Sequence, residues 1–167
     1  IQKESARIAR GPVANIDNLA DEANSFDALF VLGGAGAVRN LSNFELENYN
    51  LEYLEIDQGT QDAIKAFKSA NKPIGTSSQA GILVAGVLGK KNKGPGVQIT
   101  VGRAEKEQVE AVNALGNKLI ESTNVVVDEQ NLIVSTGGNL NAPNVDPLDL
   151  SNSMRALVDE TLKLVRK

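Results

Sequence analysis

The segment Lys72–Ala85 has the pattern of a short buried strand, a sharp turn and a buried helix, with two adjacent serines in the turn. Enzymes use such an elbow to present a nucleophile at a helix N-terminus, where main-chain N–H groups stabilise developing negative charge. Ser78 takes the position of the nucleophile at the bend. The N–H groups of Gln79 and Gly34, the latter from a glycine turn, are the candidate oxyanion-hole donors.

The groups that usually activate such a nucleophile are absent from the sequence. The chain contains no His and no Cys, so an imidazole base and a thiolate are both excluded. A serine hydroxyl attacks only when a base removes its proton, and the sequence alone places no Lys or carboxylate beside Ser78. We therefore favour the alternative that Ser77 or Ser78 caps the following helix, since Ser is a preferred N-cap residue.

A second glycine-rich segment, Gly33–Leu41, follows an apolar run. Gly34 and Gly36 match the first two glycines of a dinucleotide-binding G-x-G-x-x-G motif, but Arg39 stands at the third, where its side chain would obstruct close packing. We expect instead a glycine turn at the C-terminal end of a strand, with N–H groups facing a cleft. The alternative is a strand–helix turn without a ligand.

Two other polar segments have candidate roles. Ser135–Asn139 follows the last predicted strand and should reach the C-terminal edge of the sheet, which is the usual ligand side in open α/β folds, or it forms a plain loop. Arg7 and Arg10 are three residues apart and can share a helix face. They either bind an anion or, as we favour, pair with carboxylates on a solvated face.

The composition is that of a globular domain. The 167 residues are 41% hydrophobic and 23% charged, which suits one domain over residues 1–167. The net charge of −4 is spread over both signs and argues against a nucleic-acid partner. No apolar run approaches the roughly 20 residues that span a membrane. Without Cys or His only an oxygen-ligand metal site is possible, and we predict neither a metal nor a cofactor.

Strand and helix patterns alternate along the chain, which favours an α/β fold with a mostly parallel sheet. The predicted elements are a strand at Ala28–Leu32 buried on both faces, a helix at Thr60–Ala70, a central helix at residues 80–88, a strand at Val97–Val101, a helix at Glu105–Leu115, a hairpin at Val125–Val134 and an amphipathic helix around Met154–Val165. The segment Asn43–Gly59 is predicted to be an excursion from the regular strand and helix pattern rather than a linker between domains.

Four segments together resemble one family. Glu4–Gly11, Phe26–Ser42, Lys72–Gly75 and Val125–Val134 occur in the same order in the ElbB-like branch of the PfpI and Parkinson-associated-deglycase superfamily. This branch includes bacterial glyoxalase-III-like proteins and eukaryotic mitochondrial ES-type proteins. The resemblance implies a class I glutamine amidotransferase-like domain, which is a flavodoxin-like three-layer sandwich.

The resemblance also implies that relatives place a strand, a helix and a second strand before the segment that begins at Glu4. In the family the first of these strands is central, and its loop supplies an acid beside the nucleophile. We therefore expect the chain to lack its N-terminal β-α-β segment, which leaves a hole in the sheet or requires another segment to fill it.

Three departures from the family pattern concern the site. The relatives have Cys at the position of Ser78 and Pro at that of Gly81, and some eukaryotic relatives have His at that of Arg103. A hydroxyl without an activating base is a far poorer nucleophile than a thiolate. Glyoxalase, deglycase or amidotransferase chemistry is therefore not transferred to this chain.

The leading hypothesis is a catalytically inactive ElbB-like protein that serves as a structural or accessory component of a mitochondrial assembly, with a protein partner or as a homodimer. A bacterial source would make it cytoplasmic. The segment Asn43–Asp57, with Tyr49, Leu51, Tyr53, Leu54 and Ile56, is either a contact surface or packs onto its own domain. The alternative is a serine-dependent glyoxalase-like lyase or hydrolase that uses Ser78 on small carbonyl compounds. A third possibility is a sensor that binds a small molecule or anion at the glycine turns.

Overall fold

The centre of the fold is a mixed β-sheet. The computed structural model describes residues 2–47, 54–138 and 146–165. In this part of the chain the sheet has the order β1-β2-β6-β5, in which β1, β2 and β6 are parallel and β5 is antiparallel to β6. Its strands are β1 (Leu29–Val31), β2 (Ile74–Ser77), β5 (Val126–Asp128) and β6 (Ile133–Thr136). A separate parallel pair is formed by β3 (Gln98–Ile99) and β4 (Lys118–Leu119).

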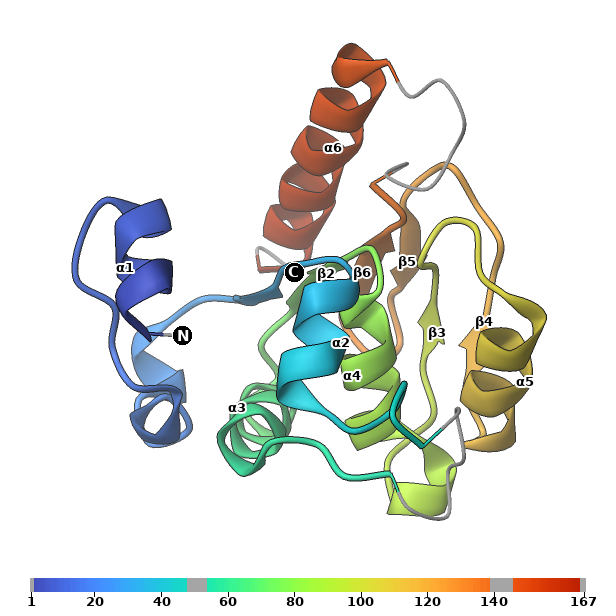
Figure 1. The fold of residues 1–167 in the computed structure, drawn as a ribbon, viewed down its shortest axis with the longest axis horizontal. Helices are drawn as coiled ribbons and strands as arrows, with labels where there is room; N and C mark the ends of the chain where they lie inside the picture. Colours follow the sequence, from blue (N-terminus) through green and yellow to red (C-terminus); the bar gives the residue numbers. More distant parts are fainter. Residues whose placement is uncertain (1, 48–53, 139–145, 166–167) are drawn as a thin grey trace.

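Helices cover both faces of the sheet (Figure 1). Leu29 and Val31 pack into the core cluster that contains α4, whereas Phe30 between them packs with Leu157 and Leu164 of α6. The alternation along β1 places these helices on opposite faces. The helices are α1 (Gln2–Ala9), α2 (Ala35–Leu41), α3 (Gln58–Ser69), α4 (Ala80–Leu88), α5 (Lys106–Ala114) and α6 (Pro147–Val165). The predicted flavodoxin-like three-layer α/β sandwich with a mostly parallel sheet is confirmed.

The distribution of apolar residues in each helix explains how that helix is buried. All nine residues of α4 are buried, as its uniformly apolar sequence predicted, and α4 contacts β2, α2 and α3. In α6 the buried residues Leu157, Thr161 and Leu164 recur at helical spacing, so one stripe of this helix faces β2 and β6. Within the described residues no helix is long and apolar enough to cross a membrane.

The strand β1 differs from its prediction. Its three residues are only half-buried rather than buried on both faces, and Leu32 directly after it is 61% exposed. β1 is less buried than predicted because it lies at one end of the sheet order and pairs with β2 alone. In the order β1-β2-β6-β5, each strand is hydrogen-bonded to its neighbour. The hole that we expected in the sheet therefore does not lie between any two of these four strands.

The strand β3 is shorter than the predicted Val97–Val101. The N–H of Gln98 donates to Oδ2 of Asp128 at 2.8 Å, and the N–H of Thr100 donates to Oγ of Ser135 at 2.9 Å. Side-chain oxygens therefore take the place of a neighbouring strand's carbonyl groups, and the regular ladder is limited to the two residues paired with β4. The predicted hairpin is confirmed as the antiparallel pair β5–β6.

The N-terminal arginines do not share a helix face. The helix α1 ends at Ala9, and Arg10 has a left-handed φ of 56°. Arg7 forms an exposed ion pair with Glu4, and the hydrogen bond from its guanidinium lowers the pKa of the Glu4 carboxyl. The interpretation as a solvated, ion-paired surface is therefore the correct one for Arg7.

The segment after α2 falls partly outside the described residues, which exclude Tyr49, Leu51 and Tyr53. Leu54 and Ile56 are half-buried and pack against the main core, and Ile56 forms a β-bridge with Ser42. For these two side chains, packing onto the same domain is the observed arrangement. Asp57 caps α3 by accepting a hydrogen bond from the N–H of Thr60, so α3 begins two residues before the predicted Thr60.

Candidate functional site

The predicted elbow is present at the end of β2. Ser78 follows the strand with a left-handed φ of 52° and is 3% exposed. Its N–H donates to the carbonyl of Thr136 at 2.7 Å, and its own carbonyl accepts from the N–H of Gly81 at 3.2 Å as α4 begins. A left-handed conformation costs a residue with a side chain about 1–2 kcal/mol. Such strain recurs at functional sites and persists only where the surroundings fix it, as these two hydrogen bonds do here.

The glycine turn after β1 lies against this elbow. The N–H of Gly33 donates to Oγ of Ser77 at 3.3 Å, and Val31 is paired in register with Thr76. Gly33 has a φ of 144°, and a Cβ there would lie 2.8 Å from Cβ of Ala37. The turn therefore needs glycine at this position, and it commits the Ser77 hydroxyl to a structural hydrogen bond.

The expected serine cap is not formed. The N-cap of α4 is Gln79, and it makes no side-chain capping hydrogen bond. The hydroxyl of Ser77 accepts from Gly33 instead, and the hydroxyl of Ser78 bonds to no group of the described residues. The N-cap interpretation that we favoured for Ser77 or Ser78 is therefore wrong. Both serines precede the N-cap position, which Gln79 occupies.

The third candidate segment also reaches this edge of the sheet. The carbonyl of Thr136 accepts the Ser78 N–H, and Oγ1 of Thr136 accepts from the N–H of Gly138 at 3.4 Å. A Cβ on Gly137 would lie 2.2 Å from Cα of Gly102, so the backbone after β6 touches the backbone after β3. Ser135 is fully buried in its structural bond to Thr100, and Asn139 lies outside the described residues.

Among the described residues, no acid or base is hydrogen-bonded to the hydroxyl of the elbow. Within residues 2–47, 54–138 and 146–165, Oγ of Ser78 makes no hydrogen bond to a Lys, Asp or Glu side chain. Arg103, where some relatives have His, is exposed. The same described residues contain no cluster of three acidic, His or Cys side chains that would hold a metal ion.

Two further polar atoms were not foreseen. Oγ1 of Thr76 and Oε1 of Gln79 are buried without a hydrogen-bond partner among the described residues. In the same part of the chain the N–H groups of Gly34 and Gln79 donate to no other group. In the described residues the elbow therefore has unused donors and acceptors, but no acid or base is hydrogen-bonded to the Ser78 hydroxyl.

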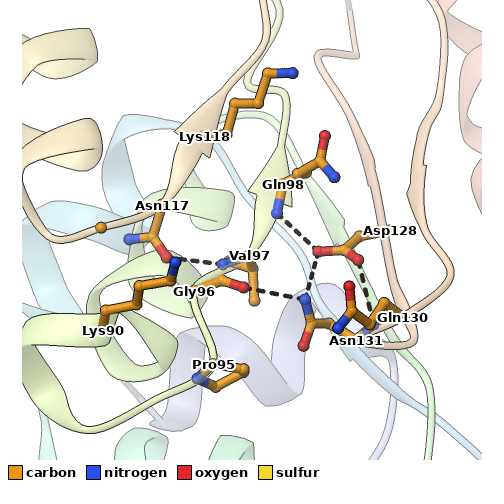
Figure 2. A pocket seen from close by; sticks show the side chains of 11 residues that line it. Lys90, Pro95, Gly96, Val97, Gln98, Asn117, Lys118, Asp128, Gln130 and Asn131 are labelled. Carbon is orange, nitrogen blue, oxygen red and sulfur yellow. Dashed lines mark hydrogen bonds between the residues drawn. The ribbon is translucent and has the colours of Figure 1, made fainter.

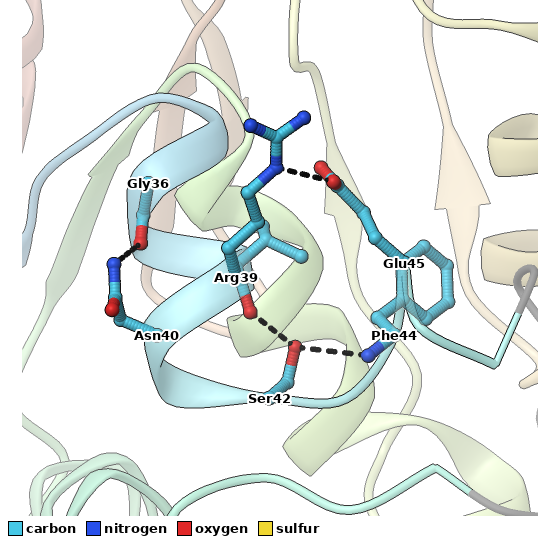
Figure 3. A network of polar contacts seen from close by, with 7 residues as sticks. Gly36, Arg39, Asn40, Ser42, Phe44 and Glu45 are labelled. Atoms are coloured by element: carbon cyan, nitrogen blue, oxygen red, sulfur yellow. Dashed lines mark hydrogen bonds and ion pairs between the residues drawn. The ribbon is translucent and has the colours of Figure 1, made fainter.

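The helix after the glycine turn does not have the features of a dinucleotide site. Arg39 is exposed, and its Nε donates to Oε2 of Glu45 at 2.5 Å (Figure 3). Nδ2 of Asn40 donates to the carbonyl of Gly36 at 2.7 Å, and Oγ of Ser42 donates to that of Val38 at 2.7 Å. The polar side chains of α2 thus bond to α2 itself and to the turn that follows it.

Three known mitochondrial proteins have similar sequences. No family model matches the chain. It is 36% identical over 143 residues to the human glutamine amidotransferase-like class 1 domain-containing protein 3, mitochondrial, covering 80% of this chain and 49% of that protein. The mitochondrial ES1 protein homolog of Rattus norvegicus is also 36% identical over 143 residues, covering 80% and 50%. The mitochondrial ES1 protein of Danio rerio is 32% identical over 148 residues, covering 80% and 52%.

The chain spans about half the length of these curated relatives. Among solved structures, an isoprenoid biosynthesis protein with an amidotransferase-like domain from Ehrlichia chaffeensis superimposes with a TM-score of 0.81 at 24% identity. The match covers 99% of this chain and 70% of that one, and it supports the fold. The mitochondrial relatives agree with the localisation that the family resemblance implied. The chain is therefore a homologue, over 80% of its own length, of the mitochondrial ES1-type glutamine amidotransferase-like class 1 proteins.

Proposed function

We propose that this ES1-type chain is a catalytically inactive, structural or accessory component of a mitochondrial assembly. One observation carries the proposal: the Ser78 hydroxyl stands at the elbow without an acid or base bonded to it in the described residues. The chain also has no His and no Cys anywhere. The elbow then serves as a scaffold, since function depends on the groups in a site rather than on the fold.

The lack of a base bonded to Ser78 in the described residues would lower any rate of reaction at this serine strongly. A positioned general acid or base contributes roughly 10²- to 10⁴-fold to an enzyme's rate. The hydroxyl of a serine is almost entirely protonated at neutral pH, so unactivated Ser78 is a weak nucleophile even beside well-placed N–H donors. Turnover by such a site would fall below that of an activated enzyme by this factor or more.

The hydrogen bonds of the elbow support a scaffold role. The bond from Gly33 to Ser77 joins the end of β1 to β2, and the bond from Ser78 to Thr136 joins β2 to β6. The bend therefore connects three neighbouring strands at their C-terminal ends. This structural role gives a reason for the elbow to keep its strained geometry without a reactive group.

A second candidate function is a serine-dependent glyoxalase-like lyase or hydrolase. It is favoured by the left-handed φ of Ser78 and by the unused N–H groups of Gly34 and Gln79, which would stabilise an oxyanion. In this function a small carbonyl compound would bind at the elbow.

Turnover assays separate the two functions. The purified protein is incubated with methylglyoxal and, separately, with p-nitrophenyl acetate, beside Ser78→Ala and a control, Ser5→Ala, which changes an exposed serine of α1. The inactive function predicts that all three proteins give the same background rate. A rate that is lost in Ser78→Ala and kept in Ser5→Ala would establish the serine-dependent function instead.

An accessory role also requires a partner, which is either another protein or a second copy of this chain. Light scattering coupled to size-exclusion chromatography measures the mass of the purified chain in solution. A mass twice that of the chain supports the homodimer, and a monomer directs the search to a different protein.

A further inference from the structure

A polar cleft lies at the opposite end of the sheet from the elbow. It is bounded by the 3-10 turn η4 (Lys90–Asn92), the approach to β3, the start of β4 and the turn between β5 and β6 (Figure 2). Its volume is about 400 Å³, which is within the range of small-molecule sites. None of the elbow residues lines it.

The floor of this cleft is a fixed and internally satisfied network. Asp128 is 4% exposed. Its Oδ2 accepts from the N–H of Gln98 and from Nδ2 of Asn131, both at 2.8 Å, and its Oδ1 accepts from the N–H of Asn131 at 3.2 Å. Behind Asn131, Nζ of Lys68 donates to the Asn131 carbonyl at 2.8 Å. The carboxylate is thus already hydrogen-bonded and accompanied by a cation.

Lys90 is held at the edge of the cleft by two glycines. A Cβ on Gly96 would lie 3.0 Å from both Cγ and Cε of Lys90, and a Cβ on Gly116 would lie 2.7 Å from Cβ of Lys90. Both glycines have left-handed φ values, 74° and 82°. The aliphatic part of Lys90 therefore packs on bare backbone at two points, which lowers the conformational entropy that Lys90 would lose on holding a ligand.

Lys118 is placed by the start of β4. Its N–H donates to the carbonyl of Val97 at 2.9 Å, and Oδ1 of the adjacent Asn117 accepts from the N–H of Val97 at 3.0 Å. The ammonium groups of Lys90 and Lys118 have no carboxylate or hydrogen-bond partner in the described part of the chain. Figure 2 shows the Gln98 side chain beside Lys118 above the floor, with its amide not engaged by the network.

We propose that this Lys90–Lys118 cleft binds a small dianion, a ligand that presents a phosphate group or two carboxylates. Two unpaired ammonium groups supply the charge, and the negative charge of Asp128 on the floor is offset by three N–H donors and by the Lys68 ammonium behind it. Lysine binds phosphate as a point charge, and amides such as that of Gln98 add hydrogen bonds. The site is separate from the elbow, so it holds whether or not Ser78 reacts.

Amide NMR spectra of the ¹⁵N-labelled protein test the site. Inorganic phosphate, succinate and, as a monoanion control, acetate are titrated at constant ionic strength. The proposal predicts saturable shifts at Gly96 and Gly116, with little change at Gly34 beside the elbow, and weaker binding of acetate. Saturation by phosphate alone identifies a phosphate site, and saturation by succinate identifies a dicarboxylate site.

Lysine variants inside and outside the cleft complete the test. Lys90→Gln together with Lys118→Gln should weaken the preferred dianion by about tenfold or more, whereas Lys91→Gln removes one charge from the same turn without touching the cleft and should leave affinity within about twofold. Unchanged spectral dispersion shows that each variant is folded. Non-saturating shifts, shifts centred on Gly34, acetate binding as tightly as the dianions, or an equal loss in Lys91→Gln would overturn the proposal.

Discussion

The main-chain N–H of Gly33 donates to the hydroxyl oxygen of Ser77 at 3.3 Å, across 44 residues of sequence. This bond distinguishes the two adjacent serines of the elbow. Ser77 is a structural acceptor that ties the glycine turn after β1 to the end of β2, whereas Ser78 holds the bend with its backbone and leaves its hydroxyl unused in the described residues. The two side chains should therefore respond differently to the same substitution.

Ser77→Ala should lower the free energy of unfolding by about 1 kcal/mol, because the N–H of Gly33 loses its acceptor in a part-buried position. Ser78→Ala is the matched control and should change stability by less than about 0.5 kcal/mol. Urea denaturation of the three proteins measures the difference. Equal losses in both variants would contradict the assignment of separate roles.

Ser78→Gly should raise stability by about 0.5–1 kcal/mol. Glycine adopts the φ of 52° without the roughly 1–2 kcal/mol penalty of a side chain, and this gain exceeds the extra backbone entropy that glycine loses on folding. Thermal unfolding checks the sign against Ser78→Ala, which keeps the penalty. A melting temperature below that of Ser78→Ala would show that the bend is not strained.

Gly137→Ala should be severely destabilising, by about 3 kcal/mol or more, because its Cβ would lie 2.2 Å from the backbone of Gly102. Gly36→Ala is the control, since a Cβ there meets nothing within 4 Å and lies in α2. The control should gain up to about 1 kcal/mol from helix propensity. Denaturation curves of both variants decide the matter, and a mild effect at Gly137 would mean that the two backbones do not touch.

Lys68 gives a pH dependence of known sign. Burial lowers the pKa of its ammonium group below the ordinary 10.5, and the attraction of Asp128 opposes the shift without cancelling it. Between the two pKa values the unfolded chain binds more protons than the folded one, so stability gains from Lys68 as pH rises toward 10.5. The stability of the wild type relative to Lys68→Met should therefore increase over this alkaline window.

Urea titrations at a series of alkaline pH values, carried out on both proteins, measure this difference. Using the difference removes the titration of all other groups that the two proteins share. A difference that stays flat or falls toward pH 10.5 would contradict the lowered pKa.

The sequence predicted those features that depend on local pattern. The uniform apolar sequence of α4 predicted its place in the core, and the turn at Asp128–Asn131 between two apolar runs predicted the hairpin. The glycine turn and the elbow were also expected from their residue types. These features follow from short-range spacing and do not require knowledge of distant partners.

The remaining features depend on contacts between distant segments. An apolar run in the sequence is compatible with a central strand and with an edge strand, so the half-burial of β1 could not be predicted. The acceptors that shorten β3 come from Asp128 and Ser135, 30 and 35 residues away. The acceptor role of Ser77 likewise requires the approach of Gly33. The Lys90–Lys118 cleft is formed by four separate segments and has no sequence motif.

Covalent labelling tests most directly whether the Ser78 hydroxyl is activated. The protein and Ser78→Ala are incubated with a fluorophosphonate, which forms a stable adduct only with activated serines, and the intact mass is then measured. We expect an unchanged mass for both proteins. One adduct per chain, found on the peptide that contains Ser78 and absent from Ser78→Ala, would contradict it.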